Sequence, residues 1–563
     1  MRPYRYWIAL AAAIYLLLVF ADRFVLVELQ LRRLAFPLTL ILVEALAIAG
    51  VGWLVRRRTG AIVNFIVGYP IFGTLCFLVG TVATSVTPAL LLFAVAGAIS
   101  IRAGWDESET TEWLKLYAPL VIILLCSFVV AQAPPVSLDE LAYHLAIPHT
   151  WTLEGRSVEL PLMSHSYFPL GVESADLPLL HLLGPESGGI ASHLLHLLSA
   201  LAVTMFVWRR TKSALLTAAI VATPALALTA GWSLVDWPLL GICAVLYAAV
   251  EDDDPQTVSA ALGAGLLTKY TFIPFAAIVL AMQRYWRGVP LGLAIGSVFF
   301  IRNLVFTSNP LAPFFGEDAP HVSGFRGAFL SDYVFDGKFI DESLGVSILV
   351  AALLARGRTA WALLACGVAL FFLAPSARIL VPFFAIPAMS ALLQRRALRI
   401  VVAVAVALQT LLIVFFTERS DAFSLIAARA GEEEYVRKQR PASDSIAWIN
   451  GLLPQQSRTL VIGLNETYWF TRPVRGGGNF DGERMSRYLA LQTPEALRQR
   501  LRGDGITHVA VIAVPLPTDV ERKVAERSTL LTPDAQRMLS QTLDRYATNV
   551  QSRADASVFT LKP

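Results

Sequence analysis

The sequence predicts a multi-pass α-helical membrane protein of about 13–15 spans with a small extracytoplasmic α/β domain at its C-terminus. Three observations lead to this fold class. Apolar residues make up 56% of the 563 residues and charged residues only 16%, against about 45–50% (glycine included) and about 25% in soluble domains. The mean hydropathy is +0.59. Charge is also unevenly distributed, because 20 of the 46 lysines and arginines fall in residues 418–563.

This composition excludes a cytosolic enzyme, a disordered chain and a disulfide scaffold, since no water-soluble fold of this size can bury so much apolar surface. The net charge of +4 is too small to predict nucleic acid as a partner. The bilayer is therefore the first partner that the sequence predicts.

A span needs about 20 mostly apolar residues. Candidate spans lie near 6–21, 34–55, 61–83, 86–101, 116–133, 190–208, 213–231, 233–250, 257–268, 270–283, 289–306, 344–356, 360–375, 378–394 and 400–417. The stretch 257–283 is compatible with one long span or with two half-helices. The first run follows Arg2 and Arg5, so a signal peptide is an alternative reading of it.

Basic residues predict the orientation of the spans. If the spans alternate, 17 of the 26 lysines and arginines before residue 418 fall on one side and seven on the other. Basic loops remain in the cytoplasm, so we expect a cytoplasmic N-terminus and place the loops 134–189 and 307–343 outside with the tail. This parity requires that 257–283 crosses twice or re-enters. The expected location is a bacterial inner membrane.

The tail from residue 418 alternates helix and strand signals. Helices are predicted at Ser443–Gly451, with Ser443 as a cap, and at Pro494–Leu501, ending at Gly503. Strands are predicted at Arg458–Ile462, His508–Val514 and Ser557–Leu561. The tail is therefore expected to be a small α/β domain.

The outer loop 134–189 begins with two adjacent carboxylates, Asp139 and Glu140, just after a span. Acidic residues near hydrocarbon are costly and are functional candidates for that reason. The alternative is that Asp139 only caps a helix, since aspartate is a good N-cap and its charge suits the positive helix end. The sequence does not decide between the two.

Other polar side chains follow in this loop. Tyr143, His144 and Glu173 are candidates for binding a substrate. Six of the eight histidines lie in or near the loop, at His144, His149, His165, His181, His193 and His196. A metal site is one reading of them, although their spacing is not that of a zinc site; interface anchors are the other. The run from Glu251 to Asp254 resembles a metal motif but is expected to be a solvated cytoplasmic loop.

Four more charged residues occur at predicted outer ends of spans. Asp236 lies in a short turn, with a helix cap as the alternative, and Lys269 lies in otherwise apolar sequence. Arg302 and Arg378 lie at the outer ends of two later spans. A cation there either extends to the interface or pairs with an anion. Together these cations can hold a phosphate, and a carboxylate can take a proton from a hydroxyl.

These motifs resemble the type C (GT-C) membrane glycosyltransferase superfamily, which includes the protein O-mannosyltransferases of glycosyltransferase family 39 and the lipid A aminoarabinose transferases. The matching positions lie in about 117–417: Asp139-Glu140 with Tyr143-His144, Asp236, Gly263–Tyr270, Arg302-Asn303 with Ser308–Pro313, and Arg378–Pro382. The sequence departs from the superfamily in having about five spans before the acidic loop instead of one. The role of the first four spans is therefore unexplained.

The resemblance implies transfer of a sugar from a polyprenyl phosphate to an acceptor hydroxyl on the outer face, with inversion at the sugar carbon. It implies that Asp139 is the general base, aided by Glu140, that Asp236 is the second acidic element, and that Lys269, Arg302 and Arg378 bind the lipid phosphate. Residues 116–417 are then the catalytic domain, and 1–115 are accessory helices.

The implied partners are a lipid-linked sugar donor and an acceptor lipid, glycan or protein. No cofactor is demanded by these residues, and assistance by a divalent cation stays open. The sequence contains neither a dinucleotide-binding nor a P-loop motif. A transporter of lipid-linked saccharides is the main alternative, for which inverted repeats would be expected, and a non-catalytic assembly subunit is a third reading.

Overall fold

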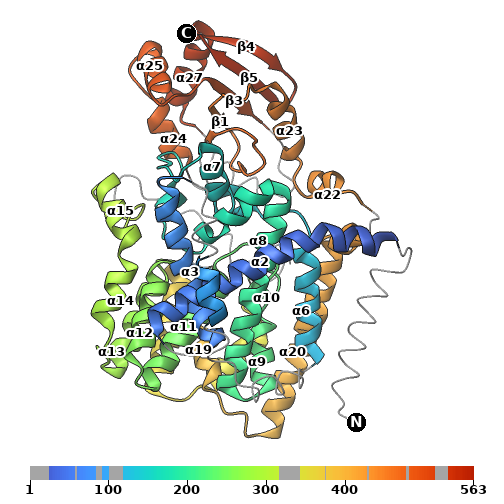
Figure 1. The fold of residues 1–563 in the computed structure, drawn as a ribbon, viewed down its shortest axis with the longest axis vertical. Helices are drawn as coiled ribbons and strands as arrows, with labels where there is room; N and C mark the ends of the chain where they lie inside the picture. Colours follow the sequence, from blue (N-terminus) through green and yellow to red (C-terminus); the bar gives the residue numbers. More distant parts are fainter. Residues whose placement is uncertain are drawn as a thin grey trace.

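The apolar runs form helices, because a segment in hydrocarbon must satisfy its backbone hydrogen bonds internally. The structure is a computed structural model that describes residues 25–57, 60–83, 92–99, 118–315, 343–373, 376–427, 430–476, 481–513 and 531–562. The helices form one body, and a smaller domain with a β-sheet lies at one end of it (Figure 1). The predicted span 6–21 and most of the predicted loop 307–343 lie outside the described residues.

The helices before the outer loop are α2 (Val25–Arg56), α3 (Ala61–Gly80), a helical stretch at 92–99 and α6 (Ala118–Ala131). The outer loop holds short elements, namely η2 (Glu140–His144), α7 (Ala146–Glu154), η3 (Ser164–Tyr167) and η4 (Glu173–Asp176), and leads into α8 (Leu177–Thr211). The remaining helices of the body are α9 (Ala214–Val221), α10 (Pro224–Ala227), α11 (Asp236–Glu251), α12 (Pro255–Leu266), α13 (Phe272–Gln283), α14 (Val289–Gly296), α15 (Val298–Thr307), α17 (Val346–Leu353), α18 (Arg358–Leu373), α19 (Ala377–Met389) and α20 (Arg396–Arg419).

Helix occurs at every predicted span that falls within the described residues. Among these residues, four helices are long and apolar enough to cross a membrane: Phe36–Arg56, Ala61–Gly80, Glu173–Thr211 and Arg396–Arg419. The helices α14 and α15 make a fifth if they are one span bent by 49°. Several others, such as the 8-residue α17, are shorter than a full crossing. The multi-pass helical class is confirmed, but most of the expected 13–15 spans are not long helices in the described part of the chain.

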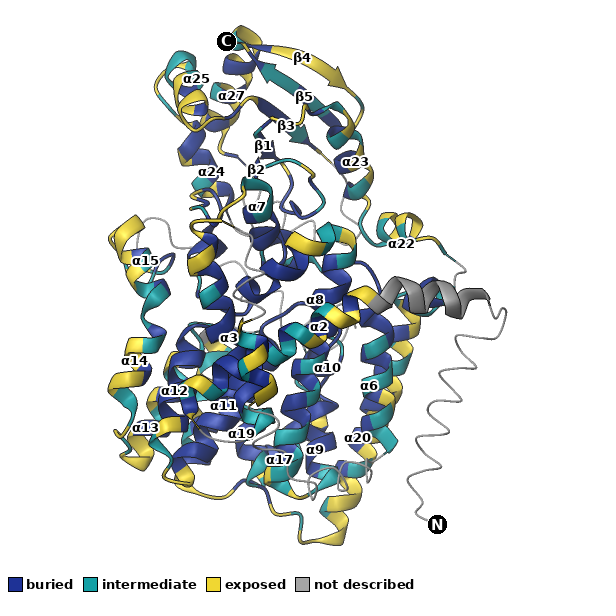
Figure 2. Cartoon of the chain, in the orientation of Figure 1, coloured by how far each residue is buried: buried dark blue, intermediate teal, exposed yellow. Residues whose placement is uncertain are grey.

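Large apolar side chains are exposed on the outside of the helical body, as expected for a surface in contact with lipid. They include Leu291, Ile301 and Val305 on α14 and α15, and Ile400 and Leu411 on α20. Figure 2 shows this pattern, with exposed residues along the outer helices and buried residues on α11 and α8 inside. The outer helices therefore face lipid and the inner ones form the core.

The stretch 257–283 is a helical hairpin rather than one long span. Helix α12 ends at Leu266 and α13 begins at Phe272, so Lys269 lies in the break between them. The far ends of the two arms meet again, because Ser259 donates a hydrogen bond to the carbonyl of Gly288 at 2.9 Å. The hairpin thus satisfies the parity condition that the predicted orientation requires.

The tail forms the predicted small α/β domain. Its five-stranded sheet has the order β2-β1-β3-β5-β4, with β1 parallel to β2 and β3, and β5 antiparallel to β3 and β4. Its strands are β1 (Thr459–Ile462), β2 (Val474–Arg475), β3 (His508–Ile512), β4 (Ala547–Ser552) and β5 (Ala556–Leu561). Two short helices, α21 (Ala422–Ile426) and α22 (Glu432–Gln439), connect the helical body to this domain. The helices of the domain are α23 (Ala442–Leu452), α24 (Gly482–Leu489), α25 (Pro494–Gly503) and α27 (Pro533–Tyr546).

One detail of the tail prediction is wrong. Ser443 is not a helix cap, because α23 begins at Ala442 with Pro441 at its N-cap position, so Ser443 lies inside the helix. A proline just before a helix fixes a φ that suits the helix start, and here it moves the boundary toward the N-terminus. The strands β2 and β4 were not predicted, because their short or polar sequences lack a clear apolar period. The helix α27 was not predicted either, although its buried residues Ala535, Leu539 and Leu543 recur at helical spacing.

Candidate active site

Asp139 lies at the start of a π-helical turn just after α6. It occupies the N-cap position of η2, yet its side chain makes no capping hydrogen bond. Instead the carboxylate forms an ion pair with the guanidinium of Arg378, which is 239 residues away in the chain. Capping alone therefore does not explain this aspartate.

Burial alone would raise the pKa of the Asp139 carboxyl. The Arg378 guanidinium beside it, with smaller contributions from His165 and Lys269, holds this pKa below its ordinary value. The carboxylate is therefore ionised and neutralised in this state, and it becomes a stronger base only if Arg378 moves away.

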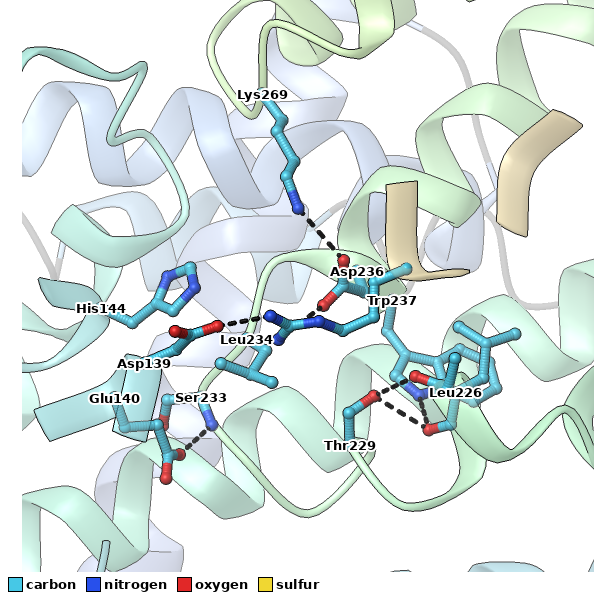
Figure 3. Close-up of polar contacts among 12 residues, drawn as sticks. Asp139, Glu140, His144, Leu226, Thr229, Ser233, Leu234, Asp236, Trp237 and Lys269 are labelled. Atoms are coloured by element: carbon cyan, nitrogen blue, oxygen red, sulfur yellow. Dashed lines mark hydrogen bonds and ion pairs between the residues drawn. The ribbon is translucent and has the colours of Figure 1, made fainter. Parts of the chain in front are cut away.

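Two carboxylates and two cations alternate in one group, which we call the charged group: Asp139, Arg378, Asp236 and Lys269. Arg378 Nη1 lies 3.8 Å from Asp236 Oδ2, and Lys269 Nζ lies 3.3 Å from Asp236 Oδ1. Figure 3 shows Asp139, Asp236 and Lys269 converging from three segments. The group has no net formal charge, which is the arrangement that makes burial of four charges tolerable.

The accessibility of the charged group is graded. The Asp236 side chain is 2% exposed, Arg378 17%, Asp139 19% and Lys269 27%. Asp236 does not cap α11, whose N-cap position is Val235. Asp236 is thus the most buried member of the group, and the other three side chains are partly exposed.

The break that presents Lys269 depends on glycine. A Cβ on Gly265 would lie 2.2 Å from the ring of Phe272, so only glycine lets the first turn of α13 fold back against the end of α12. The Gly-x-Gly part of this stretch therefore serves close packing, and the lysine follows from it at the tip of the hairpin.

Glu140 is not part of the charged group. It is fully buried and accepts hydrogen bonds from the backbone of Ser233 at 2.5 Å and from the ring of His193 at 2.8 Å. Figure 3 shows it pointing away from Asp139. Its carboxylate ties the outer loop to α8 and to the turn before α11.

His144 and Glu173 form a buried pair beside the charged group. His144 Nδ1 lies 2.9 Å from Glu173 Oε1, and the two side chains are 4% and 6% exposed. Burial lowers the pKa of His144 well below its ordinary value, and Lys269 and Arg378 add to this effect, so the ring is neutral at pH 7. Tyr143 stacks on His165, with ring centroids 4.1 Å apart.

Arg302 lies apart from the other cations. Its guanidinium donates to the carbonyl of Phe168 at 3.0 Å and to Asn303 Oδ1 at 2.8 Å, and it stacks over the ring of Phe299 at 4.7 Å. Asn303 in turn donates to the carbonyl of Tyr167 at 2.6 Å. Arg302 and Asn303 therefore hold the backbone of the outer loop rather than joining the charged group.

The histidines and the acidic run have protein partners. His149 Nε2 lies 2.9 Å from the carbonyl of Phe470, and His196 Nδ1 lies 3.1 Å from the carbonyl of Leu234. Asp252 pairs with Arg210 and Asp253 with Arg287 at the opposite end of the body. Among the described residues, no group of three or more His, Cys, Asp and Glu side chains is arranged to hold a metal ion.

The sequence did not reveal the polar residues beneath the loop. Ser192 Oγ donates to Asp176 at 2.6 Å and contacts Ser233 Oγ at 2.6 Å. These residues fix the start of α8 against the turn that carries Asp236. The one sequence signal of Ser192 was a polar side chain inside an apolar helix, which is too common to single it out.

Solved structures that match this chain do so at low sequence identity. The crystal structure of ArnT from Cupriavidus metallidurans bound to undecaprenyl phosphate shares 17% identity, with 78% of this chain and 97% of that chain covered and a TM-score of 0.45. The apo crystal structure of the same ArnT shares 15% identity, with 80% of this chain and 98% of that chain covered and a TM-score of 0.46. The cryo-EM structure of the arabinofuranosyltransferase AftD from Mycobacteria shares 14% identity, with 79% of this chain and 41% of that chain covered and a TM-score of 0.38. No protein-family model and no curated protein sequence matches the chain.

Proposed function

We propose that this chain is an integral-membrane glycosyltransferase. It moves a sugar from a polyprenyl-phosphate donor to an acceptor hydroxyl on the outer, periplasmic face of a bacterial inner membrane, with inversion at the sugar carbon. The observation that supports this is the charged group, in which two cations and two carboxylates meet among apolar helices. Charges at such a depth are costly and are retained where they serve a ligand.

The two cations suit the phosphate of the donor. A sugar polyprenyl phosphate carries one negative charge, and the departing polyprenyl phosphate carries two. Cations placed where this charge grows stabilise the transition state more than the ground state. Arg378 offers a planar fork that matches phosphate oxygens, and Lys269 offers the most exposed cation of the group.

Asp139 is the proposed general base. In the resting state Arg378 neutralises it. When the donor phosphate attracts Arg378, the carboxylate loses its cation and gains basicity. Asp139 then takes the proton of the acceptor hydroxyl, the acceptor oxygen bonds to the anomeric carbon, and the bond from that carbon to the phosphate oxygen breaks with its electron pair remaining on the phosphate.

The remaining side chains have supporting roles in this proposal. Asp236 holds Lys269 and Arg378 in position. The proposal assigns contact with the sugar to the rings of Tyr143 and His144, with Glu173 paired to the histidine. A polyprenyl phosphate is also the lipid in the ArnT crystal structure, although the proposal depends on the contacts in this chain.

The test uses the purified protein in lipid nanodiscs with a sugar polyprenyl phosphate and an acceptor, and measures release of the polyprenyl phosphate. Loss of a general base typically costs about 10²–10⁴-fold in rate, so Asp139→Asn is expected to fold and insert yet to lose transfer by this factor. The matched control is Asp254→Asn, because Asp254 caps α12 through the amide of Thr257 and asparagine caps equally well. Near-normal transfer by Asp139→Asn would refute the assignment.

A further inference from the structure

The π-helical turn that carries Asp139 is completed by the C-terminal domain. In η2 the amide of Leu145 donates to the carbonyl of Glu140 at 3.0 Å, one residue further back than in an α-helix. The carbonyl of Leu141, the α-helical partner of that amide, is thereby left available. The backbone amides of Thr467 and Tyr468 donate to it, at 2.8 and 3.2 Å.

The segment 464–470, which we call the strap, is fixed at this place by its side chains. Tyr468 is fully buried and packs with Leu141 and Leu180. Its hydroxyl donates to the carbonyl of Pro185 at 2.5 Å. The ring of His149 contacts Tyr468 at a centroid distance of 5.2 Å. The strap thus reaches the turn through both backbone and side chain.

A second contact holds the chain just before η2. Arg440, just before α23, donates from Nε to the carbonyl of Val136 at 2.5 Å, three residues before Asp139. Its Nη1 lies 3.4 Å from Glu466 of the strap. One arginine therefore links the strap to the chain that enters η2.

These contacts bear on the helical phase of the site residues. If Leu141 lost its partners from the strap, its buried carbonyl would be left unsatisfied, which is costly. The turn could recover a bond only by returning to the α-helical pattern, with Leu145 donating to Leu141. Moving the pattern by one residue rotates the side chains beyond the shift by about 100° about the helix axis. Tyr143 and His144 would then no longer face the charged group as they do with Asp139.

We propose that the strap is a positioning element, which holds η2 in its π form and so fixes Asp139 relative to Tyr143 and His144. This inference rests on the proposed function in taking Asp139 as the base. It gives the C-terminal domain a role in the transfer step beyond docking. Docking alone is supplied elsewhere, where Arg458 and Arg475 pair with Glu154 at 2.5 and 2.8 Å.

The experiment compares two tyrosines of the full-length protein in nanodiscs. Tyr468→Leu keeps apolar volume but removes the hydroxyl and the ring against His149. Tyr488→Leu is the matched control, because Tyr488 is also buried and donates its hydroxyl at 2.5 Å, but to Asp504 within its own domain. Amide hydrogen exchange of 141–146 and the steady-state constants kcat and donor KM are measured for each.

For Tyr468→Leu we expect exchange in 141–146 to become at least about tenfold faster, because the turn opens locally. We expect kcat to fall about tenfold or more, because a small misplacement of a catalytic group is costly. Donor KM should stay within about threefold of the wild-type value, since the phosphate contacts are intact. Tyr488→Leu should leave exchange in 141–146 and kcat unchanged.

The inference is overturned if Tyr468→Leu and Tyr488→Leu give the same exchange in 141–146. Should Tyr468→Leu not fold, Arg440→Met decides in its place, with faster exchange expected and unchanged exchange refuting the strap. Exchange does not depend on turnover. If the wild-type protein had no transferase activity but Tyr468→Leu still changed the exchange in 141–146, the proposed function would be refuted. The role of the strap in holding η2 in its π form would remain supported.

Discussion

At the scale of single residues, Arg378 organises the charged group. It contacts both Asp139 and Asp236, and without a cation between them the two carboxylates would repel each other in a poorly solvated place. Lys269 compensates Asp236 from the other side. The cations are thus needed for stability in the resting state and, in the proposed function, for the phosphate during turnover.

Lys269→Ala is predicted to weaken donor binding about 10- to 100-fold, because hydrogen bonds to charged groups contribute about 1.5–3 kcal/mol. Lys269→Arg should recover most of the affinity, since it restores the charge. Donor affinity is measured by titrating sugar polyprenyl phosphate into the nanodisc-embedded protein. Lys212→Ala, an exposed lysine at the C-terminal end of α8, is the control. Unchanged donor affinity together with a lower melting temperature would identify Lys269 as a structural lysine.

The candidate residues were predictable one by one, and the resemblance implied that they share a site, but the sequence did not show which of them meet. A charged residue in apolar sequence stands out because its burial is costly, and this is why Asp139, Asp236, Lys269 and Arg378 could be found. Glu140 and Arg302 give the same signal. Their partners separate them from the group: Ser233 and Phe168 lie 93 and 134 residues away and meet them only in the folded chain.

At the scale of elements, the helices before the outer loop support that loop. Helix α3 packs against η4, which begins with Glu173, and the two backbones approach closely at Gly73. A Cβ on Gly73 would lie 1.8 Å from the carbonyl oxygen of Gly171. Helix α3 is one of the first four spans, whose role the resemblance left unexplained. Its packing against η4 shows that it supports the segment that carries Glu173.

Gly73→Ala is predicted to destabilise the protein by about 1–3 kcal/mol or more, because the added methyl meets backbone that cannot move aside cheaply. It should also slow transfer by displacing Glu173 and with it His144. Gly80→Ala on the same helix is the control, since the one close contact of its methyl, at 2.4 Å, is with the rotatable hydroxyl of Ser157. Melting temperatures and transfer rates of the two variants are compared. Equal melting temperatures would show that the contact at Gly73 yields easily.

Most regular elements were predictable from the sequence, although α8 begins at Leu177, well before the predicted span 190–208, and irregular elements were not predictable. The apolar runs predicted the helices of the body, and short apolar stretches predicted β1, β3 and β5. The π-helical turn at Glu140–His144 gave no signal. Its form depends on a partner for Leu141 that the tail supplies more than 300 residues later, at Thr467. The strand β4 is largely exposed and polar, so its pairing with β5 left no apolar alternation to read.

At the scale of the whole molecule, the two ends of the helical body differ in charge and in covering. One end carries the outer loop and the C-terminal domain, which lie against each other (Figure 1) and are linked by Arg458 and Glu154. The other end carries the acidic run, where Arg210 and Arg287 pair with Asp252 and Asp253. The outer loop and the C-terminal domain must therefore lie on the same side of the membrane.

The side itself is a prediction. Basic loops remain in the cytoplasm, and the end with Arg210 and Arg287 belongs to the side that carries 17 of the 26 basic residues before residue 418. Helix α20 starts at Arg396 on that side and crosses to Arg419, where the tail begins. We therefore expect reporter fusions after residues 160, 330 and 450 to report an extracytoplasmic position. A fusion after residue 212 is the matched control and should report cytoplasm. Because the loop and the tail are in contact, a cytoplasmic signal at 450 with an outside signal at 160 is incompatible with this fold. Cytoplasmic signals at both positions would reverse the orientation. The charged group would then lie on the side away from an outer-face donor.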